Sequence, residues 1–329
     1  MNTLTNSERS THKRCIRKWH YCYGLGRIPV LTPEPFFFGS AIGLGLDAIW
    51  NDKPFINPFQ DYLGKHGYKD IEKLWPLFYK GRAMLTVYKE LYANDKDNWE
   101  LIATEHPISY DMGGVTLRGM LDKVLRNKAN GQLYVLDHKT TKDDIDDPSN
   151  DYWQIKILDP QLVGYMVALE AEFNEPVTMI YDTIKKHGSK GPKMRKGVRR
   201  KKTESDEEWE MRKADETESW DEYASRVMTE YRTDTDKYFK RRVIERTKEE
   251  MEEFRTEFLE DAVMIESSKA TGVYPMNHGS CGKAQWKCEY FNVCTKMESI
   301  ESDSFKTKQY RHPELDGDGD MEEVEDVII

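Results

Sequence analysis

Hydrophobic and polar positions alternate with different periods along the chain, and each change of period marks a predicted element. Apolar residues recur at helical spacing in three long stretches, residues 36–50, 71–91 and 248–267. Between the second and third stretches, runs rich in β-branched and aliphatic residues predict three strands, at 101–110, 115–125 and 133–141. Asn130-Gly131 separates the last two runs and is typical of a β-hairpin turn.

Shorter patterns complete the prediction. Basic and aromatic residues mix over 8–24 and predict a short amphipathic helix that carries Cys15 and Cys22. A polar loop at 141–150 precedes a predicted helix at 161–169 and a strand at 177–184, and a further strand is predicted at 236–247. The order of helix, strands, helix and strand indicates an α/β (α+β) protein.

Composition limits the class of protein. The chain has 329 residues, of which 38% are hydrophobic and 12% aromatic, enough for a packed core and against wholesale disorder. No apolar run is long enough to span a membrane, and the first fifteen residues lack the apolar core of a secretory signal. We therefore expect a cytoplasmic protein, in which the five cysteines favour metal binding over disulfides.

The net charge of −10 is unevenly distributed, and local patches decide which partners a protein binds. Residues 185–202 are densely basic, whereas 204–210 and the end of the chain are acidic. We predict a mobile charged insertion at 185–216 and a disordered acidic tail at 311–329. The basic run is either an arm that neutralises phosphates or a solvated loop, and the sequence favours neither.

The predicted hairpin carries the candidate chemistry. If its turn occupies residues 127–131, antiparallel pairing sets Asp122 opposite Asp137. Lys139 lies two residues further and points to the same face of its strand, while His138 points to the other face. Two facing carboxylates and an ammonium group are therefore expected to converge.

Apolar neighbours on that face make paired carboxylates unfavourable without a cation: Met120, Val124, Leu133 and Val135. Oxygen ligands suit Mg²⁺ or Mn²⁺, which can polarise a phosphoryl oxygen and activate a bound water. The pattern thus favours phosphodiester chemistry. A surface salt-bridge cluster is the alternative for an Asp-x-Lys sequence taken alone.

Three motifs occur in a fixed order: Gly-Met-Leu-Asp at 119–122, Leu-Asp-His-Lys at 136–139 and Gln-Leu-Val-Gly-Tyr at 161–165. This ordered set resembles the PD-(D/E)XK nuclease superfamily, and more narrowly its RecB-like branch, with a likeness that extends from Cys15 to Cys294. The resemblance implies one nuclease domain over 1–310, with a restriction-endonuclease-like mixed central sheet flanked by helices.

The same resemblance implies roles for individual residues. Asp122, Asp137 and the backbone carbonyl of His138 would bind Mg²⁺ or Mn²⁺, and Lys139 would orient or activate the attacking water. Gln161 and Tyr165 would position the nucleic acid strand. For Glu105, on the preceding predicted strand, we favour a charge at the sheet edge over a role at the metal.

One position departs from the family pattern. RecB-like nucleases usually carry a histidine after Gly-Ser-Ala-Ile on the helix before the sheet, and this chain has Gly43 there. Water could replace the missing imidazole ligand, or its loss could leave the nuclease slow or inactive. A glycine inside a helix costs about 1 kcal/mol relative to alanine, so helix stability does not explain Gly43.

Cys281, Cys288 and Cys294 crowd into fourteen residues and, with one amino-terminal cysteine, suggest a four-ligand site. Cys15 and Cys22 would share a helical face, so geometry alone leaves the fourth ligand open. Zinc and iron–sulfur ligation are both compatible with four cysteines, and the wide spacing favours iron. Burial as small apolar side chains is the alternative.

The family resemblance favours iron too, because many RecB-like nucleases hold a [4Fe-4S] cluster with one amino-terminal and three carboxyl-terminal cysteines. It implies Cys15, Cys281, Cys288 and Cys294 as ligands, with zinc as the alternative metal. Such a site would join segments 8–24 and 278–296 around the sheet. The spacing between Cys281 and Cys288 is wider than the usual family pattern.

These observations together predict a DNA exonuclease of recombination, repair or phage DNA processing, in a bacterial or phage-infected cytoplasm. Its expected partner is end-bearing or single-stranded DNA, with a recombination or helicase protein as a candidate partner and no membrane. An end-processing nuclease of CRISPR adaptation has similar motifs. The alternatives from other classes are a DNA-binding accessory protein with weak or no cleavage and a zinc-stapled structural protein.

Overall fold

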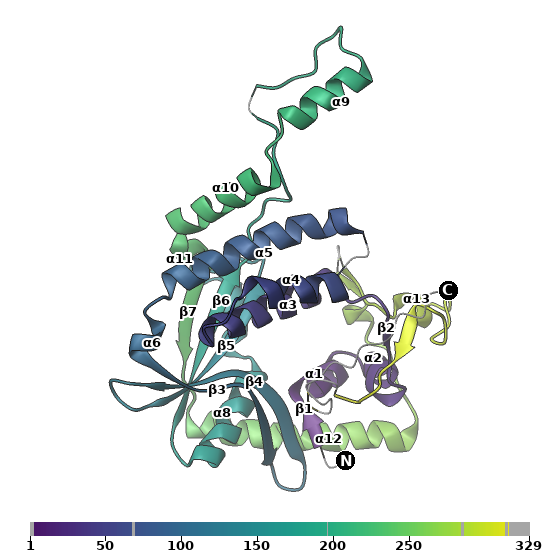
Figure 1. Ribbon diagram of the computed structural model, residues 1–329. Coiled ribbons are helices and arrows are strands. Elements are labelled where there is room, and N and C mark those ends of the chain that lie inside the picture. Colours follow the sequence, from purple (N-terminus) through teal and green to yellow (C-terminus); the bar gives the residue numbers. More distant parts are fainter. Residues whose placement is uncertain (1–2, 68–69, 196, 284–285, 313–314, 316–329) are drawn as a thin grey trace.

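A mixed sheet of six strands forms the centre of the protein (Figure 1). The computed structural model describes residues 3–67, 70–195, 197–283, 286–312 and 315. The strands follow the order β1-β4-β5-β6-β7, and β3 pairs with β4. The pairs β1–β4 and β5–β6 are parallel, and the other pairs are antiparallel. The strands are β1 Thr3–Thr5, β3 Trp99–Asp111, β4 Thr116–Asn127, β5 Leu133–Thr141, β6 Val177–Lys185 and β7 Phe239–Ile244.

The sheet opens along one edge of β4. Residues 116–118 of this strand pair with β1, and residues 123–126 pair with β5. Among the described residues, 119–122 have no strand partner on that edge, although β3 pairs with β4 on its other side. The carboxyl half of β5 pairs with β6 alone. Asp122 therefore lies where β4 and β5 separate, which we call the fork.

Helices cover both faces of the sheet (Figure 1). One face packs against α3 Glu34–Trp50, α5 Ile71–Leu91 and α10 Trp220–Thr233, with α4 Ile56–His66 beside α3. The opposite face packs against α8 Pro160–Phe173 and α12 Lys248–Thr271. Side-chain caps begin several of these helices, as at α12, where Thr247 and Glu250 form a capping box.

Short elements link the two ends of the chain. Strand β2 pairs with β10 and so joins the amino-terminal segment to the carboxyl-terminal one. The remaining elements are α1 Asn6–Arg14, α2 Ile16–Trp19, the π-helical turn η1 His20–Gly24, β2 Arg27–Pro29, α6 Asp95–Asn98, α7 Asp151–Ile157, α9 Asp206–Asp215, α11 Thr235–Tyr238, the 3₁₀ turn η2 His278–Ser280, β8 Gly282–Lys283, β9 Trp286–Lys287, α13 Phe291–Cys294 and β10 Phe305–Thr307. No helix in the described part of the chain has the length and hydropathy to cross a membrane.

Most long elements agree with the prediction, including the three long helices, the strands from 101 to 141 and their hairpin. The predicted helix at 8–24 is wrong as one element, because Cys15 adopts an extended conformation (φ −166°, ψ 113°) between α1 and α2. The predicted strand at 236–247 begins with a helical turn, α11, before β7. Helix α4 was not predicted.

The charged segments contain regular structure and specific contacts. Within 185–216 the structure contains α9, whose Ser205 and Glu208 form a capping box. Ion pairs within the segment join Arg200 to Asp206 and Arg212 to Glu204. In the predicted disordered tail, Arg311 and His312 contact buried Glu8, whereas residues 313–314 and 316–329 lie outside the described residues.

Candidate active site

The hairpin register sets two carboxylates side by side at the fork. Lys123 pairs with Leu136 and Val124 with Val135, so the next positions outward are Asp122 and Asp137, in the predicted register. The Asp122 carboxylate accepts a hydrogen bond from the backbone N–H of His138 at 2.7 Å. Val124, Leu133 and Val135 are fully buried beneath them. Asp122 therefore bridges the gap between the diverging strands.

Asp137 and Lys139 form a close ion pair on the α8 side of the sheet. The Nζ atom of Lys139 lies 2.9 Å from Oδ1 and 2.7 Å from Oδ2 of Asp137. Burial, together with the charge of Asp122, raises the pKa of Asp137 to about 6 even though Lys139 opposes this shift. Burial lowers the pKa of Lys139, but the charges of Asp137 and Asp122 outweigh it and raise that pKa overall.

Helix α8 brings two further predicted residues to this place. Its N-cap Asp159 accepts a hydrogen bond from the backbone N–H of Gln161 at 3.0 Å and another from the Tyr181 hydroxyl at 2.8 Å. The Gln161 side-chain amide donates to the Tyr165 hydroxyl at 2.6 Å. Burial and the nearby charge of Asp137 raise the pKa of Tyr165. Tyr165 is thus close enough to Asp137 for the charge of that carboxylate to change its pKa.

Gly119, the first residue of the Gly-x-x-Asp motif, allows Tyr165 to approach the sheet. A Cβ atom at position 119 would lie 2.9 Å from Cε1 of Tyr165 and 3.4 Å from two side-chain atoms of Ile108. A cavity of about 240 Å³ opens here, and its lining includes Gly119, Gln161, Tyr165, Asn6 and Arg118. The first and third motifs therefore meet at one cavity.

Two further acidic residues lie near Asp122 and Lys123: Glu105, for which the sequence favoured a charge at the sheet edge, and Asp47, which sequence reasoning missed. Glu105 has a left-handed backbone (φ 47°) between Thr104 and His106, which pair with Lys123 and Leu121. Desolvation and the charges of Asp122 and Asp47 raise the pKa of Glu105 to about 7. Asp47 lies on α3, 3.9 Å from buried Lys123. The sequence could have pointed to Asp47 only through its position, one helical turn after Gly43.

Gly43 itself has open surroundings, since a Cβ atom there would meet nothing within 4 Å. In the described residues, no three His, Cys, Asp or Glu side chains are grouped closely enough to hold a metal ion. At the fork the reason is visible, because Lys139 contacts both oxygens of Asp137 and the His138 amide binds Asp122. The two carboxylates still supply the oxygen donors that Mg²⁺ and Mn²⁺ prefer.

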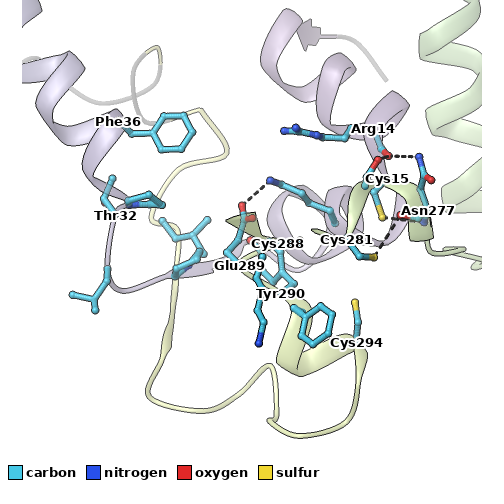
Figure 2. A pocket seen from close by; sticks show the side chains of 18 residues that line it. Arg14, Cys15, Thr32, Phe36, Asn277, Cys281, Cys288, Glu289, Tyr290 and Cys294 are labelled. Carbon is cyan, nitrogen blue, oxygen red and sulfur yellow. Dashed lines mark hydrogen bonds and ion pairs between the residues drawn. The ribbon is translucent and has the colours of Figure 1, made fainter. Parts of the chain in front are cut away.

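The cysteines gather at a second place, far from the fork in sequence. Cys15, Cys281, Cys288 and Cys294 line one cavity of about 430 Å³ (Figure 2). The sulfur atoms of Cys15 and Cys281 lie 3.5 Å from the backbone N and O of Asn277, respectively. Figure 2 shows that the sulfur of Cys294 points toward the same part of the cavity.

Cys22 differs from these four cysteines in its surroundings, although Cys288 touches the same apolar cluster. It packs against the apolar cluster of Tyr290, Val293 and Phe305 and does not line the cavity. The predicted sharing of a helical face by Cys15 and Cys22 is wrong, because Cys15 lies in the extended link and Cys22 in the π-helical turn. The predicted cysteine segment 278–296 includes residues 284–285, which lie outside the described residues.

Comparison with known proteins agrees with the motifs. The family model of the PD-(D/E)XK nuclease superfamily matches residues 3–295. Similar solved structures include a candidate exonuclease from Eubacterium rectale, with 10% identity, a TM-score of 0.46 and coverage of 92% of this chain and 90% of that one. Another is SSO0001, with 13% identity, a TM-score of 0.22 and coverage of 56% and 62%. A search among curated proteins finds no match.

The family match covers the hairpin, α8 and every cysteine of the cavity, so it includes both sites described above. The structural similarities are too low to add to it. On the extent of the family match, the chain belongs to the PD-(D/E)XK nuclease superfamily.

Proposed function

We propose that the protein is a Mg²⁺- or Mn²⁺-dependent DNA exonuclease of the RecB-like branch, acting in recombination, repair or phage DNA processing. The observation that carries the proposal is the fork, where Asp122 and Asp137 lie side by side with Lys139 and Tyr165 around them. Asp122, Asp137 and the His138 carbonyl would hold the cation. When bound, it would polarise a phosphoryl oxygen and lower the pKa of a bound water.

The chain's own residues have distinct parts in this proposal. A carboxylate that ligates a cation releases its ammonium partner, so Lys139 would become available to the attacking water. Lys139 would then orient that water and stabilise developing negative charge. Gln161 and Tyr165, joined by their hydrogen bond, would position the strand at the cavity beside Gly119.

Cleavage by the anaerobically purified protein tests this function. End-labelled single- and double-stranded DNA and a circular single strand are incubated with Mn²⁺ and resolved by length. We expect shortening of the linear substrates, an intact circle, and loss of cleavage by roughly a hundredfold or more in Asp137→Ala, because a buried metal ligand is removed. Equal digestion by wild type and Asp137→Ala would remove the proposal, and cleavage of the circle would make the enzyme an endonuclease.

Gly43 supports a second candidate function, a DNA-binding accessory protein with weak cleavage. The open space around Gly43 admits a larger side chain, so Gly43→His tests the contribution of the missing imidazole. We expect Gly43→His to cleave DNA faster than wild type with Mn²⁺, whereas Gly43→Ala, which adds no ligand, does not. A wild type that binds DNA without cleaving it, combined with an active Gly43→His, would favour the accessory function.

We also propose that Cys15, Cys281, Cys288 and Cys294 hold a [4Fe-4S] cluster, with zinc as the alternative. Their shared cavity supports this set, and Cys22 provides a matched control. We expect a brown protein whose iron is absent from Cys15→Ser and kept in Cys22→Ser. A colourless protein with stoichiometric zinc would overturn the iron assignment, and iron loss only in Cys22→Ser would overturn the choice of Cys15.

A further inference from the structure

A large basic concavity lies at the carboxyl ends of β5 and β6. It has a volume of about 1150 Å³, and seven of its fifteen lining residues are lysines whereas two are glutamates. We call it the lysine pocket. Three of its lysines come from separate segments: Lys80 from α5, exposed Lys142 after β5 and buried Lys186 after β6. The parallel pairing of β5 with β6 brings the last two together, because the backbone N–H of Lys186 donates to the carbonyl of Thr141 at 2.7 Å.

Some lysines of this pocket are paired, as Lys185 is with Asp144 at 2.8 Å and Lys73 with Asp70 at 3.4 Å, but Lys80 and Lys186 have no such partner among the described residues. Lys186 is only 8% exposed, and its Nζ atom lies 5.0 Å from the ring centroid of Phe38. In the part of the chain that the structure describes, no carboxylate lies within ion-pair distance of Lys80 or Lys186, and Lys142 reaches Glu34 only at 3.8 Å. Burial, with Lys142 and Lys80 nearby, lowers the pKa of Lys186 to about 8. Burial lowers the pKa of Lys80 as well.

Such an arrangement costs stability unless an anion completes it. A buried ammonium without a counter-ion is unfavourable, and the neighbouring lysines add repulsion. Phosphate groups carry the matching charge, about −1 in a phosphodiester and about −1.5 to −2 at a strand end, together with several acceptor oxygens. Lysine provides strong point-charge donors for them.

We propose that the lysine pocket binds a phosphate group of the nucleic acid strand on which the fork acts. The inference rests on the proposed nuclease function. Lys142 follows Lys139 by three residues, about 10 Å along an extended chain, which corresponds to about three stacked nucleotides at about 3.4 Å each. The fork faces α8 and the pocket faces α5, so a strand that crosses the carboxyl ends of β5 and β6 from one face to the other would contact both places. The pocket would hold the strand in register while the fork acts on a neighbouring phosphodiester.

Inorganic phosphate is the first probe, because it tests the pocket without catalysis. We expect phosphate to raise the Tm of the wild type more than chloride does at equal ionic strength. Lys186→Met should abolish this difference and still fold, since methionine has similar length and can pack on Phe38. Lys89→Met is the matched control, on the same helix as Lys80 but exposed. The proposal would be overturned if phosphate raised the Tm of the wild type no more than chloride, or if Lys89→Met lost the phosphate-dependent increase in Tm as Lys186→Met does.

DNA binding is then measured by fluorescence anisotropy across a salt series, in an Asp137→Ala background that prevents digestion. We expect Lys80→Met and Lys186→Met each to weaken binding about threefold to tenfold. The slope of log affinity against log salt concentration should also become shallower, by about 0.7 for each single-strand phosphate that the variant no longer neutralises. Unchanged affinity and slope in both variants would overturn the pocket as a phosphate site.

Substrate ends distinguish two sources of the phosphate. If both variants lose affinity only for 5′- or 3′-phosphorylated strands, the pocket binds a terminal phosphate. If they lose affinity equally for hydroxyl-ended and circular strands, it binds the internal backbone. Either result supports the pocket. If cleavage depends on metal and on Asp137 but the lysine variants bind DNA normally, the pocket proposal is wrong and the nuclease function stands. If the lysine variants lose DNA affinity but the wild type shows no cleavage that depends on Asp137, the nuclease function is wrong and the pocket stands.

Discussion

Two glycines, Gly119 on β4 and Gly43 on α3, show how strongly a single position depends on its surroundings. The added Cβ at Gly119 would lie 2.9 Å from the buried Tyr165 ring, whereas at Gly43 it would meet open space. The sequence does not reveal this difference in available space, since both glycines lie among apolar residues. Gly119 is therefore required by packing, and Gly43 is not.

This contrast predicts opposite effects of one substitution. Gly119→Ala should lower the free energy of unfolding by about 1–3 kcal/mol, because the new methyl group overpacks Tyr165. Gly43→Ala should raise it by about 0.5–1 kcal/mol, because alanine is the better helix former. Urea denaturation measures both. A destabilised Gly43→Ala would mean that this position is packed after all.

At the scale of elements, α1 is fastened to the carboxyl-terminal segment through one buried carboxylate. Glu8 is fully buried and accepts hydrogen bonds from Trp19 at 3.0 Å and from Nε of Arg311 at 3.1 Å, with His312 at 3.2 Å. Burial alone would raise its pKa, but His312, Arg311 and Trp19 lower it to about 2. Two distant ends of the chain thus share one ion cluster.

The sign of this shift makes a pH prediction. A carboxyl whose folded pKa is about 2 and whose ordinary value is 4.5 stabilises the fold above pH 4.5, and this contribution disappears as the pH falls toward 2. Glu8→Gln should therefore be less stable than wild type by about 2–3 kcal/mol at neutral pH, with the gap closing below pH 4.5. Exposed Glu207→Gln should show no such gap. Urea melts across the pH range measure it, and a constant gap would contradict the linkage.

The elements also show where sequence patterns are reliable. The hairpin at 115–141 was predicted with its register, because a short turn and a two-residue period determine which positions face each other. The helix at 8–24 was wrong, since its break depends on interactions with the far end of the chain. The Arg17 N–H donates to the carbonyl of Pro275, and the Asn277 N–H lies 3.5 Å from the Cys15 sulfur.

At the scale of the whole molecule, an arm at residues 191–218 projects from the body and carries α9 (Figure 1). Its two legs meet at the backbone bridge between Met194 and Thr217, and no residue of α9 is buried. Several of its basic side chains pair with acidic neighbours, as Arg200 does with Asp206. These pairs reduce the charge available to bind DNA, whereas Lys80 and Lys186 of the lysine pocket have no ion-pair partner among the described residues.

Excision of the arm should therefore change little. Replacement of residues 196–215 by a short Gly-Ser linker should alter the free energy of unfolding by less than about 1 kcal/mol, because α9 buries no residue and loop closure depends weakly on length. DNA affinity should fall less than in Lys186→Met. Urea denaturation and anisotropy test both statements, and a roughly tenfold drop in affinity on excision would identify the arm as the main DNA-binding element.

Local information in the sequence was sufficient for the long helices, the hairpin and the register that places Asp122 beside Asp137, because neighbouring residues encode periodicity and turns. The family match over residues 3–295 agrees with the motif order. Only the tertiary structure decided that Cys15 lines the cysteine cavity and Cys22 does not, and that Lys80 joins Lys142 and Lys186. These groupings arise where segments distant in sequence pack together, and no local period records which distant side chains will meet.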